Sequence, residues 1–481
     1  MLFNSLDYLI FFVVVYLLYW LVAARDVRVR NGFLIVASYV FYGWWNPIFL
    51  LLIVFSSAVD YQVGFELGKG GDPRHRRRLL MVSLAVNLGL LGVFKYYNFF
   101  AESLQSQLAS VGFNWFNLQT LSFVLPVGIS FYTFQTMSYS IDVYRRRMEP
   151  TRDPFAFFAY VCFFPQLVAG PIERAQSLLP QFFQQRKWDA ATTRDGLRQI
   201  LWGFFKKIAI ADVCAPVVNR AFDAPGAFDA PFLVFAVVLF AFQIYADFSG
   251  YSDIAIGTAR LFGFDLRQNF SFPYFSRDIA EFWRRWHISL STWFRDYVYI
   301  PLGGSRVSRG RQVRNVMIVF MVSGLWHGAN WTFVIWGFVH ALLFLPLILM
   351  KRNRTFLDTP GGDGFLPRPS ELLRMLLTFG LVCYAWIYFR AASFTDALAY
   401  QQAILEGLPG SLNQLKVWSN VKALLLVMFM LAVEWTQRRE LYGLAIPRVS
   451  RPLRWAIYLL VLMVIVFYGE FGSNEFIYFQ F

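Results

Sequence analysis

The chain has 481 residues, of which 57% are hydrophobic and only 15% are charged, and its formal net charge is +14. This composition is too apolar for the polar surface of a water-soluble protein and is typical of a chain surrounded by lipid. It excludes a soluble globular protein and predicts an integral membrane protein.

Apolar runs along the whole chain predict membrane-spanning helices, because a helix needs about 20 mainly apolar residues to cross the hydrocarbon core. Weaker runs raise the expected number of spans to roughly ten or eleven. We therefore expect an all-α multi-pass fold with re-entrant and interfacial segments. No stretch of the sequence separates a second core, so residues 1–481 are expected to form one domain. The clearest runs cover residues 8–24, 79–100, 199–215, 232–246, 333–350, 372–387, 421–433 and 457–468.

The positive charge is concentrated in short clusters of arginine. Beside membrane spans, such clusters mark cytoplasmic loops and attract anionic lipid more often than they bind nucleic acid. We therefore expect contacts with membrane lipid and no nucleic-acid partner. The clusters lie at Arg25 to Arg30, Arg74 to Arg78, Arg145 to Arg147 and Arg306 to Arg314.

The first two clusters constrain the path of the chain between them. If the loops near Arg28 and Arg76 are both cytoplasmic, the apolar stretch between them crosses the membrane twice or enters it and returns. The sequence Trp44-Trp45-Asn46-Pro47 interrupts this stretch, because the residue before a proline is disfavoured in a helix. The sequence therefore predicts two short half-helices that meet there.

A polar stretch follows the apolar run 232–246. It contains Asp247, Ser249, Tyr251 and Asp253 within seven residues. Polar groups at that depth need partners or water, so we expect Asp247, Ser249 and Tyr251 to line a cavity or its mouth. A helix end that is capped by Asp and Ser explains part of the same motif and stays open as an alternative.

A second polar and aromatic segment runs from Asn269 to His287. Asp278, with Glu281 three residues later, resembles a capping box, so a helix is expected to start here. Glu281 and Arg285 stand one turn apart and are expected to pair. The helix is expected to continue past His287 and to carry one stripe, formed by Phe282, Trp286, Ser289 and Trp293.

The stretch from Met317 to Met350 is too long for one simple span. Glycines flank His327, so a helix is expected to break there. Irregular backbone inside a bilayer is tolerated only where protein or a watery cavity covers it. This predicts that His327 lies in an internal passage.

Two of the four histidines therefore lie in tryptophan-rich sequence, in Trp286-His287 and Trp326-His327. Neither His-x-x-x-His nor His-Glu is present, as a metal site would need, and there is no Gly-x-Ser-x-Gly elbow of a serine hydrolase. General base catalysis requires only an imidazole within reach of a hydroxyl and fits best. From spacing alone, a buried histidine with a satisfied hydrogen bond stays open as an alternative, more so for His287 than for His327.

At these residues the sequence resembles a known family, the membrane-bound O-acyltransferases, and in particular their bacterial alginate O-acetyltransferase branch. The resemblance covers most of the chain, with a signature core at about residues 120–350. The similar segments are residues 162–174, 247–253, 282–297, 325–331 and the aromatic terminus 476–481.

This resemblance implies an enzyme with a central funnel through the membrane. The invariant histidine of the family matches His327, and its second histidine matches His287. Members take an acyl group from a cytoplasmic donor and deliver it to a hydroxyl on the far side, or to a partner that carries it onward. The alginate branch acetylates exported polysaccharide together with periplasmic acetyltransferase partner proteins.

We therefore predict a multi-pass O-acetyltransferase of the bacterial inner membrane, in which His327 accepts the hydroxyl proton and His287 orients the donor or the acceptor. The acyl donor is expected to be acetyl-CoA or another cytoplasmic acetyl carrier, and neither a bound cofactor nor a metal is expected. Arg285, Arg295 and Asn330 are candidate hydrogen-bond donors to a thioester or phosphate. The remaining substrate-binding candidates are Asp247, Ser249, Tyr251 and Trp326.

Three alternatives compete with this prediction. A teichoic-acid D-alanyltransferase would share the fold and the histidines, but it would take its group from a carrier protein. A transporter would show paired repeats or symmetric broken helices, and we find neither in the sequence. A structural scaffold would not need two histidines in such surroundings.

Overall fold

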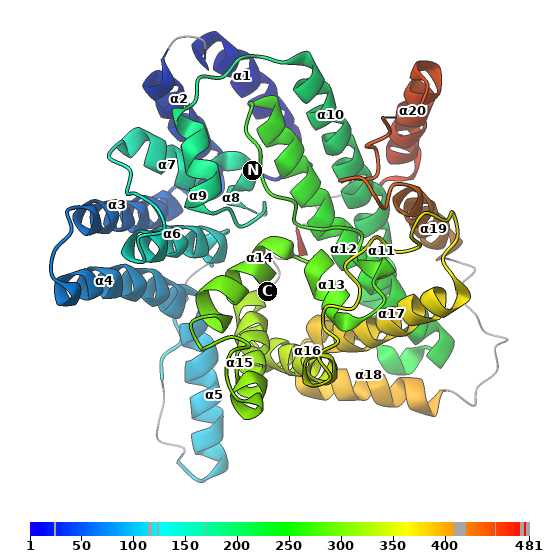
Figure 1. Ribbon diagram of the computed structural model, residues 1–481. Helices are drawn as coiled ribbons and strands as arrows, with labels where there is room; N and C mark the ends of the chain where they lie inside the picture. Colours follow the sequence, from blue (N-terminus) through cyan, green and yellow to red (C-terminus); the bar gives the residue numbers. More distant parts are fainter. Residues whose placement is uncertain are drawn as a thin grey trace. The chain divides into compact units, whose positions relative to one another are not determined.

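The computed structural model describes residues 1–23, 26–113, 118–122, 125–168, 170–407, 420–447, 449–471 and 476–477. These residues form helices joined by turns and loops, with no strand among them, which confirms the all-α prediction (Figure 1). Arg25 and residues 478–481 of the aromatic terminus, which the sequence analysis singled out, lie outside the described residues.

The helices divide into two compact units. One comprises Met1–Thr193 with Ala259–Leu266, and the other comprises Arg194–Thr258 with Arg267–Phe481. The units are defined by internal packing, so the single domain expected from the sequence stays a prediction. Helices of the first unit are α1 (Leu6–Ala23), α2 (Val27–Gly43), α3 (Ile48–Gly68), α4 (Pro73–Leu91), η1 (Gly92–Tyr96), α5 (Tyr97–Ser110), α6 (Ile129–Tyr144), α7 (Pro154–Cys162), α8 (Phe164–Leu167), α9 (Ala175–Leu178) and η2 (Leu179–Phe183).

The chain breaks between α2 and α3 at Trp44–Pro47, as the sequence predicted. Asn46 stabilises the start of α3, because its side-chain oxygen accepts a hydrogen bond of 3.0 Å from the Ile48 amide. The expectation of two short half-helices is wrong. The helices have 17 and 21 residues, and α3 is long enough to cross a membrane, because Pro47 precedes its first turn instead of interrupting it.

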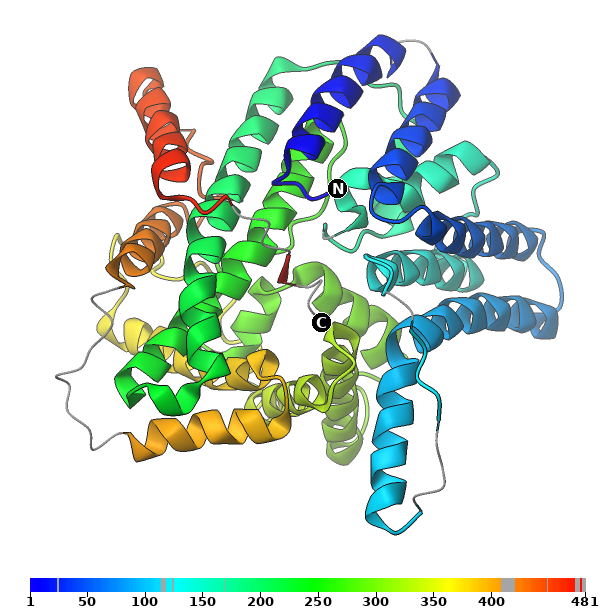
Figure 2. The same cartoon turned by 180° about the vertical axis from the view of Figure 1, so that it is seen from behind.

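One buried carboxylate ties three helices of this unit together. Helices α3, α4 and α6 lie side by side in both views (Figure 2). Asp60 of α3 accepts hydrogen bonds from Ser83 and Asn87 of α4 and from Ser140 of α6, the last two at 2.7 and 2.8 Å. A carboxylate in apolar surroundings needs such donors, so this cluster fixes the packing of the three helices.

Helix α10 (Ala190–Phe204) starts in the first unit and continues into the second. The remaining elements of the second unit are η3 (Phe205–Ala211), α11 (Asp212–Asp223), η4 (Pro225–Ala227), α12 (Ala230–Leu261), η5 (Pro273–Phe275), α13 (Ile279–Arg285), α14 (Ile288–Phe294), η6 (Arg295–Tyr299), α15 (Arg309–His327), α16 (Trp331–Leu349), α17 (Pro369–Arg390), α18 (Phe394–Glu406), α19 (Val421–Thr436) and α20 (Arg451–Tyr468), with the last residues of α12 assigned to the first unit.

Helices α15 and α16 form a closely packed pair that carries His327 at its turn. A Cβ atom on Gly324 would lie 2.1 Å from the Phe333 carbonyl oxygen, and one on Gly337 would lie 2.3 Å from that of Phe320. Only glycine permits this approach of the two backbones. Helix α15 ends at His327, so the predicted break is confirmed, and the close packing fixes where that end lies.

Six helical segments of the described chain are long and apolar enough to cross a membrane, by length and composition. The multi-pass prediction is therefore confirmed, and the total of ten or eleven spans stays a prediction. The six segments are Ile48–Gly68, Pro73–Ser110, Ala230–Leu261, Trp331–Leu349, Pro369–Arg390 and Arg451–Tyr468.

Candidate active site

The first histidine lies at a break between two short helices. The predicted helix start is confirmed, because Asp278 caps α13 by accepting a hydrogen bond of 2.6 Å from the Glu281 amide. The continuous stripe from Phe282 to Trp293 is wrong. Helix α13 ends at Arg285, and His287 has a φ of +43°, in the left-handed region that is rare for a residue other than glycine.

The preceding loop causes this break. The Ser271 amide donates to the Arg285 carbonyl oxygen at 2.9 Å, and the Ile288 amide donates to the Asn269 carbonyl oxygen, also at 2.9 Å. These bonds engage the backbone on both sides of His287, so the left-handed turn persists although it is strained. The turn directs the chain so that His287 and His327 come together.

The two histidines are neighbours in the structure. Their ring centres lie 6.1 Å apart, and both side chains are buried. Trp326 lies 5.8 Å from His287, and Trp336 lies 5.1 Å from His327, both measured between ring centres. The candidate site is therefore a buried pair of imidazoles surrounded by aromatic rings.

Asn269 holds His287, and sequence reasoning gave it no role. Its side-chain oxygen lies 3.0 Å from Nδ1 of His287, and its side-chain nitrogen donates to Ser252 at 3.1 Å. Phe248 packs against the same imidazole, edge to face, at 4.6 Å. A buried amide in an aromatic run was the available signal, but nothing in the sequence connects it to a histidine 18 residues later.

The polar stretch Asp247–Asp253 lies inside α12, so the alternative of a capped helix end is wrong. Buried lysines of η3 compensate its carboxylates, which is why the helix can continue through it. Lys207 forms ion pairs with Asp247 at 2.8 Å and with Asp212 at 2.9 Å. Lys206 donates a hydrogen bond to Ser249 at 2.8 Å and forms an ion pair with Asp253 at 2.6 Å.

Sequence reasoning missed both lysines, although each is an ionisable residue inside the apolar run 199–215. The pairing places Asp247 and Ser249 in a buried charge network. Tyr251 lies one turn further along α12, and its ring centre is 4.4 Å from that of Phe476.

The described part of the aromatic terminus contacts this stretch. The Ile477 amide donates to Asp247 at 2.7 Å, and Phe476 and Ile477 are both buried. The Phe476 ring also packs against Phe248, at 5.8 Å between centres. Asp247 therefore accepts a hydrogen bond from the Ile477 amide and forms an ion pair with Lys207, next to the residues that surround His287.

Two of the predicted substrate-binding residues hold local structure. Asn330 caps α16 by accepting from the Thr332 amide at 3.0 Å, and it donates to the Ala392 carbonyl oxygen at 2.9 Å. Arg285 pairs with Glu281 at 3.0 Å, as predicted.

Glu281 belongs to a larger ion cluster centred on Arg277. This arginine pairs with Glu281 at 2.9 Å, with Asp358 at 3.0 Å and with Glu371 at 2.9 Å. Hydrogen bonds from Arg277 lower the pKa of the exposed Asp358 carboxyl below its ordinary value. The cluster joins the start of α13 to the loop after α16 and to the start of α17.

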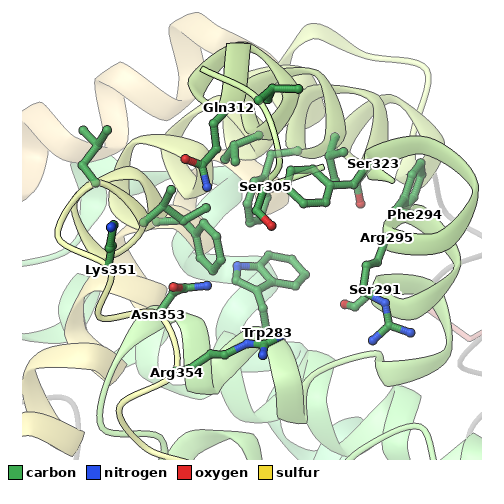
Figure 3. Close-up of a pocket in the computed structure, with 18 of the residues that line it drawn as sticks. Trp283, Ser291, Phe294, Arg295, Ser305, Gln312, Ser323, Lys351, Asn353 and Arg354 are labelled. Atoms are coloured by element: carbon green, nitrogen blue, oxygen red, sulfur yellow. The ribbon is translucent and has the colours of Figure 1, made fainter. Parts of the chain in front are cut away.

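The last candidate, Arg295, lines a cavity of 770 Å³, a size typical of small-molecule sites. Figure 3 shows the Trp283 indole in this pocket, with Lys351, Asn353 and Arg354 on one side and Arg295 on the other. Arg309 also lines it, and none of the described lining residues is Asp or Glu. The pocket is therefore cationic and suits an anionic ligand, although Arg295 itself pairs with Asp296 at 2.6 Å.

Aromatic rings connect this pocket to the histidine pair. The Trp283 ring lies 4.9 Å from His340, His340 lies 4.9 Å from Trp336, and Trp336 lies 5.1 Å from His327. His340 is a third buried histidine that sequence reasoning missed, and its place in the apolar run 333–350 was the signal. Only a few rings therefore separate the pocket from the candidate catalytic pair.

The fold and the site together define a multi-pass membrane enzyme with a buried histidine pair and an adjoining cationic pocket. The model of the membrane-bound O-acyltransferase family matches residues 150–388. The chain belongs to this family and is an acyltransferase, which confirms the resemblance found in the sequence.

The similarity to named relatives extends beyond the segment that the family model matches. A probable alginate O-acetylase of Pseudomonas aeruginosa is 38% identical over 84% of this chain and 75% of its own length. A peptidoglycan O-acetyltransferase of Helicobacter pylori is 34% identical over 78% and 73%. A teichoic acid D-alanyltransferase of Streptococcus thermophilus is 29% identical over 48% and 60%.

Proposed function

We propose that this protein moves an acetyl group from a cytoplasmic donor across the membrane for O-acetylation of an exported polysaccharide, and that it does so in the bacterial inner membrane. The observation that carries the proposal is the buried pair of His287 and His327, with ring centres 6.1 Å apart. The names of the two relatives that are similar over most of this chain support acetyl as the group transferred.

His327 acts as the base in this reaction. The acceptor oxygen forms a bond to the acetyl carbonyl carbon while His327 takes the hydroxyl proton. The bond from that carbon to the sulfur of the donor then breaks, and the proton passes from His327 to the sulfur. His287 orients the substrate. Periplasmic acetyltransferase proteins are the expected partners that complete delivery to the polymer.

The cationic pocket beside Trp283 binds the donor. Acetyl-CoA carries phosphate groups, and the carrier-bound alternative carries a phosphopantetheine arm, so both present anionic oxygen to Arg309, Lys351 and Arg354. The contacting rings of Trp283, His340 and Trp336 lie between this pocket and His327, so the proposed path of the acetyl group requires these rings to separate.

Deleting the gene is expected to remove ester-linked acetate from the exported polysaccharide without lowering polymer yield, because the enzyme modifies a chain that others make. The measurement is acetate released from purified polymer by mild alkali. A plasmid copy should restore it. Unchanged acetate would contradict the proposal, and loss of ester-linked D-alanine instead of acetate would establish the D-alanyltransferase alternative.

Replacing both Lys351 and Arg354 by Ala is expected to raise the KM for acetyl-CoA about tenfold, since each exposed ion pair contributes up to about 1 kcal/mol. The kcat should change little, because these residues lie in the pocket and not at the histidines. Acetyl transfer by membrane vesicles at increasing salt checks this, and the salt dependence of KM should weaken in the variant. Arg451→Ala, at the exposed start of α20, is the control, and an equal KM effect there would refute the role of the pocket.

A further inference from the structure

The hydrogen bonds around Asn269 determine which nitrogen of His287 carries the proton. The Asn269 side-chain oxygen accepts from the Ser289 backbone amide at 3.4 Å and from the Ser289 hydroxyl at 2.9 Å, and its side-chain nitrogen donates to Ser252 at 3.1 Å. Because a backbone amide can only donate, whereas a hydroxyl suits either orientation, the Ser289 amide assigns the oxygen to the side that faces His287. Because an amide oxygen can only accept, Nδ1 of His287, at 3.0 Å, must be the donor.

Nε2 is then the nitrogen with the free lone pair. Among the described residues it has no hydrogen-bond partner, and the whole side chain is buried. The ring is held by the Asn269 bond, by the left-handed turn of its own backbone and by Phe248 at 4.6 Å. A neutral imidazole held in this way presents one acceptor in one direction.

We propose that Asn269 is a positioning residue that keeps His287 in the tautomer protonated at Nδ1, so that Nε2 accepts a hydrogen bond from an O–H or N–H group of the bound substrate. This inference rests on the proposed function and deepens it, because it makes His287 an acceptor that orients substrate beside the base. In the other tautomer, Nε2 carries the proton and would instead repel such a group.

Other ionisable groups around His287 come from several elements. His327 of α15 lies 6.1 Å away between ring centres. Asp247 and Asp253 of α12 are paired with Lys207 and Lys206 of η3, so their charges are largely compensated. A new charge at position 269 would therefore act on His287 more directly than any of these groups does.

The test compares Asn269→Asp with Asn269→Leu in membrane vesicles supplied with radiolabelled acetyl-CoA. In Asn269→Asp the carboxylate still accepts from Nδ1 but stabilises the imidazolium, so a higher pH is needed to obtain the neutral ring. Because the active state requires both His287 and the base His327 to be neutral, the acid limb of the activity profile should move up by about one pH unit, with activity retained above it. Asn269→Leu removes the acceptor and should lower activity about 10- to 100-fold at every pH.

Asn315→Asp is the matched control. It places the same new carboxylate at another buried asparagine, whose amide contacts the Leu302 carbonyl oxygen, and its acid limb should coincide with that of the wild type. If Asn269→Asp loses activity without a shifted limb, or if both Asn269 variants match the wild type, the inference is overturned. His327→Ala distinguishes failure of the proposed function from failure of the role of Asn269. Full activity in His327→Ala would refute the proposed function itself. An inactive His327→Ala together with an unshifted Asn269→Asp profile would refute only the role of Asn269.

Discussion

His327→Ala is expected to abolish acetylation of the exported polymer. Positioned acid–base groups contribute about 10²- to 10⁴-fold to rate, and a loss of that size would leave ester-linked acetate below detection in cells. The measurement is alkali-released acetate from a deletion strain that carries the variant, at a protein level equal to the wild type. His75→Ala is the control, because this histidine is exposed on α4.

A size-matched variant separates chemistry from packing. His327 packs against Trp326 and Trp336, at 5.1 Å from each between ring centres, so Ala also leaves a cavity. His327→Gln keeps much of the volume and a polar end but cannot act as a base near neutral pH. Both variants should be inactive. Substantial acetylation by His327→Gln would mean that an imidazole at this position is not required.

Lys207→Met is expected to destabilise the protein by about 3 to 5 kcal/mol, enough to lower the amount of folded protein in the membrane. The lysine lies between Asp247 and Asp212, and all three side chains are at most 3% exposed. Removing it leaves two carboxylates in apolar surroundings without their shared cation. The measurement is the midpoint of thermal unfolding in detergent, followed by tryptophan fluorescence.

Two further variants make this prediction specific. Lys422→Met breaks the ion pair between Lys422 and Glu470, whose side chains are 43% and 50% exposed. This variant should lower the free energy of unfolding by less than about 1 kcal/mol. Adding Asp247→Asn and Asp212→Asn to Lys207→Met removes the uncompensated charges and should recover part of the lost stability. A Lys207→Met protein that melts with the wild type would show that this network does not support the fold.

Several features could be predicted because they depend on residues close together in the chain. Composition determines that the protein lies in a membrane, since 57% hydrophobic residues cannot be covered by a polar surface. Three features follow from the local backbone preferences of single residue types. Proline accounts for the break at Trp44–Pro47, glycine for the end of α15 at His327, and Asp for the cap at Asp278. The two histidines could be singled out because an ionisable group in apolar sequence is energetically costly and therefore marks a candidate functional site.

The arrangement of the site depends on contacts between distant segments, which periodicity does not reveal. The helix predicted through His287 stops because the loop at residues 269–271 bonds to its backbone, and only that turn brings the ring to Asn269 and His327. The stretch Asp247–Asp253 remains helical because lysines 40 or more residues earlier in the chain neutralise it, as the 43-residue separation of Lys206 and Ser249 illustrates. Hydrogen bonding and charge compensation act over a few ångströms in space whatever the distance along the chain, so the sequence determined which residues carry the chemistry and the tertiary structure alone decided which of them meet.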